Sequence, residues 1–235
     1  MAKTGAPEGT CVVAERQLAG RGREGRSWHS DAGSGLYLSI LLRPDIDTRI
    51  FPILTLVCAV ALHDSISQIS GARPDIKWPN DILVGEKKIC GMLAETCDTP
   101  TGPAVVMGIG VNLATNTLPP EIKENATSIS DQTGNEVDFD MVLRSVLDHI
   151  VSRYVDFTRT ADVPGILNDW SSRSSYYSGK MVTVRSGNET IKGETAGLDP
   201  FGSLMIKTGH GEVVTVTAGD VETLRPLPAD DPSDR

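Results

Sequence analysis

Residues 20–28 of the chain, GRGREGRSW, alternate glycine with arginine and end on a tryptophan. Glycine lets the backbone approach a ligand closely, and each arginine fork can bind two phosphate or carboxylate oxygens. The segment therefore predicts an anion-binding loop, with Trp28 as a flat apolar surface at its end. Composition alone leaves two alternatives open, a solvated Arg/Gly linker and an RNA-contacting Arg/Gly tract.

Two further regions carry candidate site residues. Lys77 begins the segment KWPND, at the end of a predicted strand and beside a proline that bends the chain, so its ammonium is placed to face an anion. The alternative is a lysine whose stem lies along the core next to a core tryptophan. Glycines recur at 91, 108 and 110 within predicted strands, where glycine often marks the close approach of a ligand or of another backbone. Asn112 follows them and would contact a nucleotide or a metal-bound water, or only cap a loop.

These segments must be positioned by an ordinary globular chain of 235 residues with a formal net charge of −9. That charge argues against the whole chain binding a polyanion, although four arginines lie between residues 11 and 30. The four cysteines form no C-x-x-C pair and no Cys/His cluster has zinc spacing, so we expect a reducing, cytoplasmic setting and no protein metal site. Residues 1–9 contain no apolar run, which excludes a signal peptide.

Hydrophobic periodicity predicts an α/β (α+β) organisation. The strands are expected at 10–14, 36–42, 75–78, 81–84, 88–95 and 104–113, and the helices at 50–62, 137–157 and 163–172. The first helix is predicted to be amphipathic and too short to span a bilayer, and residues 15–35 to be a long functional loop. After residue 178 five short strands are expected at 181–184, 191–198, 203–206, 213–216 and 221–224, which suggest a small SH3-like barrel. The expected division is 1–178, 179–227 and a disordered tail at 228–235.

The ordered segments AERQLAGRGREGRSW, GLYLS, KWPNDIL, KKICGMLAE and GIGVNL resemble the catalytic domain of biotin protein ligases, from about residue 5 to 112. The resemblance implies a mixed-sheet catalytic domain similar to class II aminoacyl-tRNA synthetase cores, followed by an SH3-like β-barrel. It implies that ATP and biotin, with Mg²⁺, give biotinyl-5′-AMP and pyrophosphate. The biotinyl group then passes to a lysine of a biotin carboxyl carrier protein of acetyl-CoA carboxylase or a related carboxylase.

The same resemblance implies roles for individual residues. Lys77 and Arg23 would be catalytic, stabilising the charge where the biotin carboxylate attacks the α-phosphorus. The residues implied to bind biotin and the adenylate are Gln17, Gly20, Arg21, Gly22, Arg23, Lys77 and Gly91. The residues implied to bind the nucleotide are Arg26, Trp28, Tyr37 and Asn112.

The sequence also departs from the family pattern. A Ser/Thr-Thr/Ser-Asn motif of the biotin pocket should precede the strand that leads to Gln17, and Met1 falls after that point. Three explanations are open: a start site placed too far downstream, which we favour, a truncated sequence, and a true short variant with weak biotin binding. We expect the chain as given to bind biotin poorly and to fold marginally. We expect no winged-helix domain before the catalytic part, so a repressor role is not supported. We also expect no nucleic-acid partner and no membrane contact, and pairing into a homodimer stays open. The alternatives are a lipoate or octanoate ligase or transferase, a non-catalytic remnant that only binds the carrier domain, and an Arg/Gly nucleic-acid-binding module.

Overall fold

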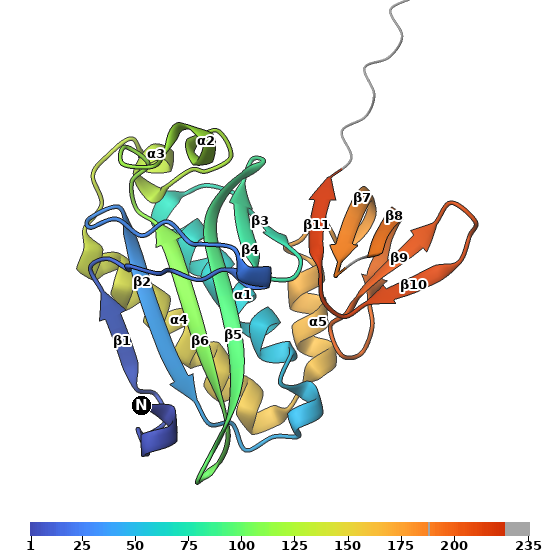
Figure 1. The fold of residues 1–235 in the computed structure, drawn as a ribbon, viewed down its shortest axis with the longest axis horizontal. Helices are drawn as coiled ribbons and strands as arrows, with labels where there is room; N and C mark the ends of the chain where they lie inside the picture. The colour runs from blue at the N-terminus through green and yellow to red at the C-terminus, as the bar shows by residue number, and fades with distance from the viewer. Residues whose placement is uncertain (188, 224–235) are drawn as a thin grey trace, which may run out of the picture.

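The computed structural model describes residues 1–187 and 189–223, which form two antiparallel sheets with helices packed on the larger one (Figure 1). The larger sheet contains β1 (Cys11–Ala14), β2 (Gly35–Leu42), β3 (Pro74–Lys77), β4 (Asp81–Val84), β5 (Lys87–Thr99) and β6 (Gly102–Asn112), in the order β1-β2-β6-β5-β4-β3. The helices are α1 (Ile53–Ser70), α2 (Pro120–Lys123), α3 (Ile129–Thr133), α4 (Phe139–Thr160) and α5 (Val163–Ser171), with 3₁₀ turns η1 (Ala2–Thr4), η2 (Arg23–Gly25) and η3 (Thr48–Ile50).

The expectation of a mixed sheet is wrong, because all neighbouring strands of this sheet within the described ranges pair antiparallel. The reason lies in the connections. Strands β3 to β6 follow one another through short turns, such as the Gly85-Glu86 turn between β4 and β5, and a parallel pair needs a long crossover. One isolated parallel bridge joins Lys88 to Ala126.

Helix α1 is longer and more deeply buried than its periodicity predicts. It runs on to Ser70, where Gly71 ends it with a φ of 66°. The prediction of an amphipathic helix is wrong, since α1 lies between the sheet, α4 and α5 and is buried on several sides. The expectation that this helix is too short to span a bilayer is also wrong, since its 18 residues are long and apolar enough to do so by length and composition alone. Most of α1 is, however, buried within the protein. It is therefore the central helix of the core.

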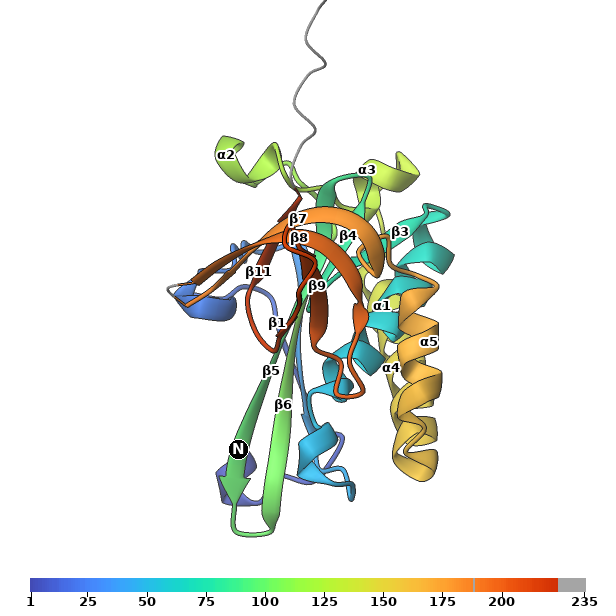
Figure 2. The same ribbon diagram turned by 90° about the vertical axis from the view of Figure 1, so that its right-hand side faces the viewer.

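The other two long helices agree with their sequence signals. Asp138 caps α4 by accepting a hydrogen bond from the Met141 amide at 3.0 Å, and Asp162 caps α5 through the Gly165 amide at 3.0 Å. Helices α1, α4 and α5 all cover one face of the larger sheet, and η2 with its flanking loop lies on the opposite side (Figure 2). The helix-free face is therefore the one available for a site.

The smaller sheet contains β7 (Ser178–Ser186), β8 (Glu189–Leu198), β9 (Leu204–Thr208), β10 (Val213–Val216) and β11 (Asp220–Thr223), in the order β10-β9-β8-β7-β11. The five strands expected after residue 178 are confirmed. Trp78, buried beside the larger sheet, donates from Nε1 to the carbonyl of Gly202 at 2.9 Å and so joins the two sheets. The predicted tail at 228–235 lies outside the described residues.

Candidate functional site

One cross-strand row of the larger sheet organises the site. The register pairs Tyr37 with Gly110, Gly110 with Gly91, Gly91 with Asp81 and Asp81 with Lys77, across β2, β6, β5, β4 and β3. Directly opposed residues on neighbouring strands share a face. Residues that the sequence nominated in three separate segments therefore lie along one line on one face.

Trp28 lies flat on the two glycines of this row. A Cβ atom at Gly110 would come 2.5 Å from Cε2 of the Trp28 ring, and one at Gly91 would come 2.9 Å from Cζ3. Both positions must be glycine for the indole to lie against the sheet. The ring thus forms an apolar wall on the backbone of β5 and β6, and the ammonium of Lys88 lies 5.0 Å from its centroid.

Residues 20–28, the arginine loop, form a narrow hairpin. The Trp28 amide donates to the Gly20 carbonyl at 2.9 Å and the Gly22 amide donates to the Arg26 carbonyl at 2.7 Å. The tip is tight, with positive φ at Glu24 (54°) and Gly25 (75°). Gly20 is required at the base, since a Cβ there would clash with backbone and side-chain atoms of the opposite arm. The loop thus presents its three arginines from a defined backbone.

Four basic side chains converge on a cavity of about 240 Å³ between the arginine loop and the sheet. Arg21 pairs with Glu95 at 2.7 Å, and Lys88 pairs with Asp81 at 2.7 Å. Arg26 pairs with Asp220 of β11. Arg23 instead donates to neutral oxygens, the Gly219 carbonyl at 3.2 Å and Oδ1 of Asn80 at 3.5 Å. Four cations facing three carboxylates leave a cavity suited to an anionic ligand.

Seven of the eleven residues to which the resemblance gave catalytic or binding roles line this cavity, together with the strand glycines Gly108 and Gly110: Gln17, Arg21, Gly22, Arg23, Arg26, Trp28 and Gly91. Gly20, Tyr37, Lys77 and Asn112 do not. Gln17 accepts a hydrogen bond at Oε1 from the Ser30 hydroxyl at 2.7 Å, which fixes its amide at the cavity edge. The arginine loop is thus the part of the site that the sequence located best.

Tyr37 is in the sheet row but does not reach the cavity. Its hydroxyl lies 2.8 Å from Oγ of Ser34 and donates to the Asp31 carbonyl at 3.0 Å. Burial raises the pKa of Tyr37, so the hydroxyl stays protonated as a donor. Its observed contacts hold the turn that precedes β2.

Asn112 uses its amide on the backbone. Its Nδ2 donates to the carbonyl of Thr127 at 3.0 Å and to that of Lys88 at 3.3 Å. These are loop contacts, one of the two alternatives for this residue, and the nucleotide contact stays a prediction. The contact matters for the site, because the Lys88 backbone also bonds to Asn125 and Thr127, at 2.9 Å each.

The lysine in the cavity is Lys88, which the sequence analysis did not nominate. Lys77 ends the row on β3, beyond Asp81, and does not line the cavity, so the geometry does not support its assignment as the catalytic lysine. Strict two-residue alternation along β5 would direct Lys88 and Gly91 to opposite faces. A register shift opposite Ile82 and Leu83 re-aims Lys88 toward Asp81.

Asn80, Asp81, Glu95 and Asp220 also line the cavity. For Asn80 and Asp81, in the KWPND segment, the sequence left open a turn or a metal and ribose contact, whereas it gave Glu95 and Asp220 no site role. Glu95 ends the quoted segment KKICGMLAE. Asp220 had no local signal, since only the tertiary fold brings β11 to the arginine loop.

The fold and this cavity define an α+β protein whose cationic cavity, on the open face of an antiparallel sheet, is suited to an anionic ligand. Residues 1–112 match the Biotin/lipoate A/B protein ligase family, and residues 177–224 match the Biotin protein ligase C terminal domain. The chain is 39% identical over 225 residues to the Bifunctional ligase/repressor BirA of Bacillus subtilis, covering 94% of this chain and 68% of that protein.

Two further relatives extend this comparison. The Biotin--[acetyl-CoA-carboxylase] ligase of Mycobacterium tuberculosis is 32% identical, over 93% of this chain and 80% of that protein. The biotin protein ligase of Aquifex aeolicus in complex with biotin and ATP superimposes with a TM-score of 0.81 at 32% identity, covering 94% of this chain and 91% of that one. The chain therefore belongs to the biotin protein ligase family, as its motifs indicated.

Proposed function

We infer that this chain ligates biotin in an ATP-dependent reaction and transfers the biotinyl group to a lysine of a biotin carboxyl carrier protein. The observation that carries the inference is the convergence of Arg21, Arg23, Arg26 and Lys88 on one cavity beside Trp28. Joining a carboxylate to a nucleotide phosphate brings two anions together, and fixed cations offset their repulsion. The related Aquifex aeolicus biotin protein ligase forms a complex with biotin and ATP.

In the proposed reaction an oxygen of the biotin carboxylate attacks the α-phosphorus of ATP. A phosphorus–oxygen bond forms, the bond to the β-phosphate oxygen breaks, and pyrophosphate leaves with its electron pair. Lys88 and Arg23 stabilise the charge on the α-phosphate oxygens, and Trp28 covers the apolar part of the ligand. The amine of the carrier lysine then attacks the biotinyl carbonyl, an amide forms, and AMP leaves.

Mg²⁺ is part of this proposal as a partner of the nucleotide. Among the residues at 1–187 and 189–223, no three His, Cys, Asp or Glu side chains gather into a metal site. The cavity carboxylates each face a cation, so the ion would be held chiefly by the phosphates, as Mg²⁺ commonly is. When bound, it supplies charge neutralisation to the leaving pyrophosphate.

The finer architecture is also a proposal. We assign residues 1–178 to a ligase domain whose core is similar to that of class II aminoacyl-tRNA synthetases, and 179–227 to an SH3-like barrel, of which 224–227 lie outside the described residues. The match of 177–224 to the family's C-terminal domain and the start of β7 at Ser178 support this boundary. A cytoplasmic location, and pairing of two chains, stay proposals of the same kind.

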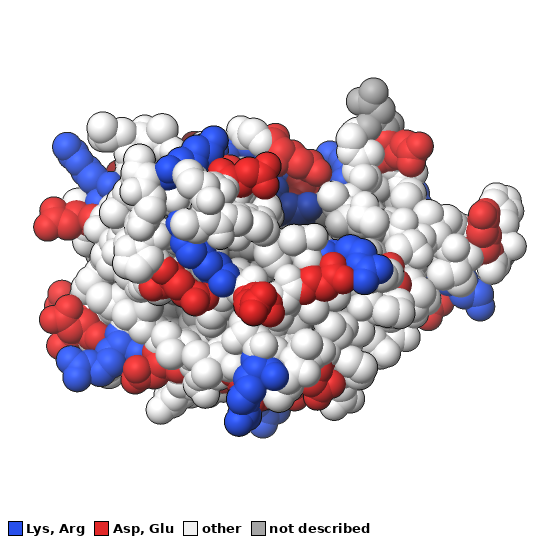
Figure 3. Space-filling view, turned by 90° about the horizontal axis from the view of Figure 1, so that it is seen from below, with Lys and Arg blue, Asp and Glu red and all other residues white. Residues whose placement is uncertain are grey.

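A nucleic-acid-binding role receives no support from the surface in view. Basic and acidic side chains are interspersed on the face seen from below, without a continuous basic stripe (Figure 3). The arginines of the loop line the cavity and bind oxygens of the protein.

The test is biotin-dependent exchange of labelled pyrophosphate into ATP, repeated with lipoate and octanoate and followed by transfer to a biotin carboxyl carrier domain. We expect exchange with biotin alone and label transfer that requires the carrier lysine. Exchange driven only by lipoate would move the assignment to the lipoate branch of the family. Failure of exchange with every acid, together with salt-sensitive RNA binding that ignores ATP, would overturn ligation altogether.

A further inference from the structure

We propose that Asp220, the first residue of β11 in the smaller sheet, is a positioning residue that fixes Arg26 and with it the arginine loop over the cavity. Asp220 and Arg26 form an ion pair between Oδ2 and Nη2. The carboxylate side chain is 19% exposed and that of Arg26 is 61% exposed. Asp220, the better-buried partner, is therefore the fixed group, and its contact restrains the more exposed Arg26 side chain.

A second contact reaches the same point of the smaller sheet. Gly219 immediately precedes Asp220, and its carbonyl accepts from Nη1 of Arg23 at 3.2 Å. Gly219 has a φ of 156°, and a Cβ there would come 2.7 Å from the Arg185 carbonyl, so the position requires glycine. Both arginines that flank the loop tip are therefore bound by adjacent residues of one strand end.

The geometry leaves Arg26 able to bind a ligand while it is held. A guanidinium carries five N–H donors, and the ion pair with Asp220 engages one end of the fork. Holding that end orders a long side chain before any ligand arrives, which lowers the entropy cost of ligand binding. Asp220 itself lines the cavity, so it acts at the edge of the site.

The hairpin spreads this restraint along the whole loop. Arg26 is bonded through its carbonyl to the Gly22 amide, and Gly20 is bonded to Trp28. Releasing Arg26 from Asp220 therefore weakens first the hydrogen bond between Gly22 and Arg26. The hydrogen bond between Gly20 and Trp28, and with it the position of the Trp28 ring, is weakened next. The smaller sheet thus takes part in forming the site, and the nucleotide affinity depends on it.

The experiment compares Asp220→Asn with Glu222→Gln, a matched control on the same strand. Glu222 pairs with Arg185 at 3.3 Å, both are exposed, and neither lines the cavity. We expect Asp220→Asn to raise the KM for ATP about 3- to 10-fold with kcat little changed. It should also accelerate hydrogen exchange at the amides of Gly22 and Trp28. Glu222→Gln should change neither the KM for ATP nor the amide exchange. Asp220→Glu, which keeps the carboxylate, should show wild-type values of both.

A double-mutant cycle with Arg26→Gln separates positioning from a general structural effect. If Asp220 acts through Arg26, Asp220→Asn adds no further rise in KM in the Arg26→Gln background. Additive effects, or unchanged loop exchange in Asp220→Asn, would overturn the proposal. The kinetic reading rests on the proposed function, whereas amide exchange is measured on the protein without substrates. A chain without ligase activity would therefore refute the function and still allow the anchoring role to be judged.

Discussion

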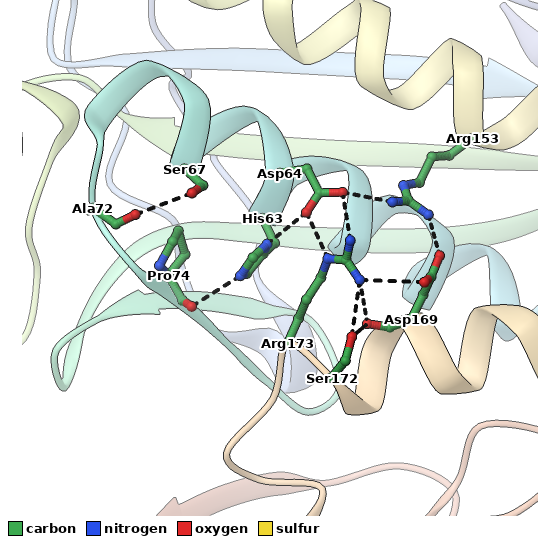
Figure 4. Close-up of polar contacts among 9 residues, drawn as sticks. All are labelled: His63, Asp64, Ser67, Ala72, Pro74, Arg153, Asp169, Ser172 and Arg173. Carbon is green, nitrogen blue, oxygen red and sulfur yellow. Dashed lines mark hydrogen bonds and ion pairs between the residues drawn. The ribbon is translucent and has the colours of Figure 1, made fainter.

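Two clusters of ion pairs in this protein are built differently. The Asp64 carboxylate on α1 accepts hydrogen bonds from Nη2 of Arg153 and from Nε of Arg173, at 2.7 Å each. Nδ1 of His63 lies 2.9 Å from the same carboxylate (Figure 4). Arg153 and Arg173 both also bond Asp169. Each member thus has several partners, and the cluster joins α1 to α4 and to the end of α5.

The cavity pairs are single contacts. Lys88–Asp81, Arg21–Glu95 and Arg26–Asp220 each join one cation to one carboxylate, and two of the three cations are more than half exposed. Donors are left over on every guanidinium. A closed network with every group bound resists exchange and stabilises the fold, whereas single pairs around a cavity can admit a competing anion.

The electrostatics of Asp64 agree with this contrast. Burial alone would raise the pKa of Asp64, but hydrogen bonds from Arg173, His63 and Arg153 together lower it to about 2. The carboxylate is therefore held ionised by its own fold. Variants that remove ion pairs from one cluster and leave the other intact test whether the cavity pairs serve activity and the Asp64 network serves stability.

Loss of the cavity lysine should have the largest effect. Lys88→Met removes a cation expected to face the α-phosphate, and adenylate formation should fall about 10²- to 10³-fold, the size typical of a lost charge-stabilising donor. The melting temperature should change little. Single-turnover formation of biotinyl-5′-AMP measures the first quantity and calorimetry the second. Lys77→Met is the matched control, and an equal loss in that variant would return the catalytic role to Lys77.

Displacing the Trp28 ring from the two glycines of the sheet should give the next largest loss of activity. Gly110→Ala places a methyl group 2.5 Å from Cε2 of Trp28, so the ring must move off the sheet. A displacement of about 1 Å in a site can cost 10²-fold in rate, so we expect kcat/KM for biotin to fall about that far. Gly108→Ala adds a methyl group to the same cavity wall without touching the ring, since its Cβ meets only the Leu93 carbonyl at 3.5 Å, so it controls for filling of the cavity. Equal losses in both variants would mean that the position of the ring is unimportant.

Some features of the fold follow from local sequence patterns, and others depend on distant parts of the chain. The arginine loop, the long helices and the five C-terminal strands were predictable, because glycine, capping aspartates and alternation act within a few residues. Antiparallel pairing of the larger sheet could have been inferred from the short turns between β3 and β6. The burial of α1 could not be predicted in this way, because it depends on packing against α4 and α5, which lie much later in the sequence.

The site residues follow the same division. Trp28 and Gly91 carried local signals that the fold brings together. Lys88 was missed because a register shift in β5, which alternation does not reveal, turns its side chain to the cavity. Asp220 was missed because it is remote in sequence from Arg26 and joins the site only through the smaller sheet.

The helix network should affect stability and leave catalysis intact. Asp64→Asn removes the charge that both arginines bind, and we expect a loss of about 2 kcal/mol in the free energy of unfolding at pH 7. The KM for ATP should stay near the wild-type value. Urea denaturation and pyrophosphate exchange measure the two quantities. Asp156→Asn, which removes an exposed pair with Arg159, should cost no more than about 0.5 kcal/mol.

Acid titration of the same variant gives the smallest and most specific effect. The pKa of Asp64 is about 2 in the fold against an ordinary value of 3.8, so its ionised form stabilises the protein fully above about pH 4. That contribution is lost as the pH falls from about 4 to about 2. The gap between wild type and Asp64→Asn in unfolding free energy should therefore narrow from about 2 kcal/mol at pH 7 to under about 1 kcal/mol near pH 2. A gap that stays constant with pH would show that the variant acts through packing, and the distinction between the two clusters would then rest on catalysis alone.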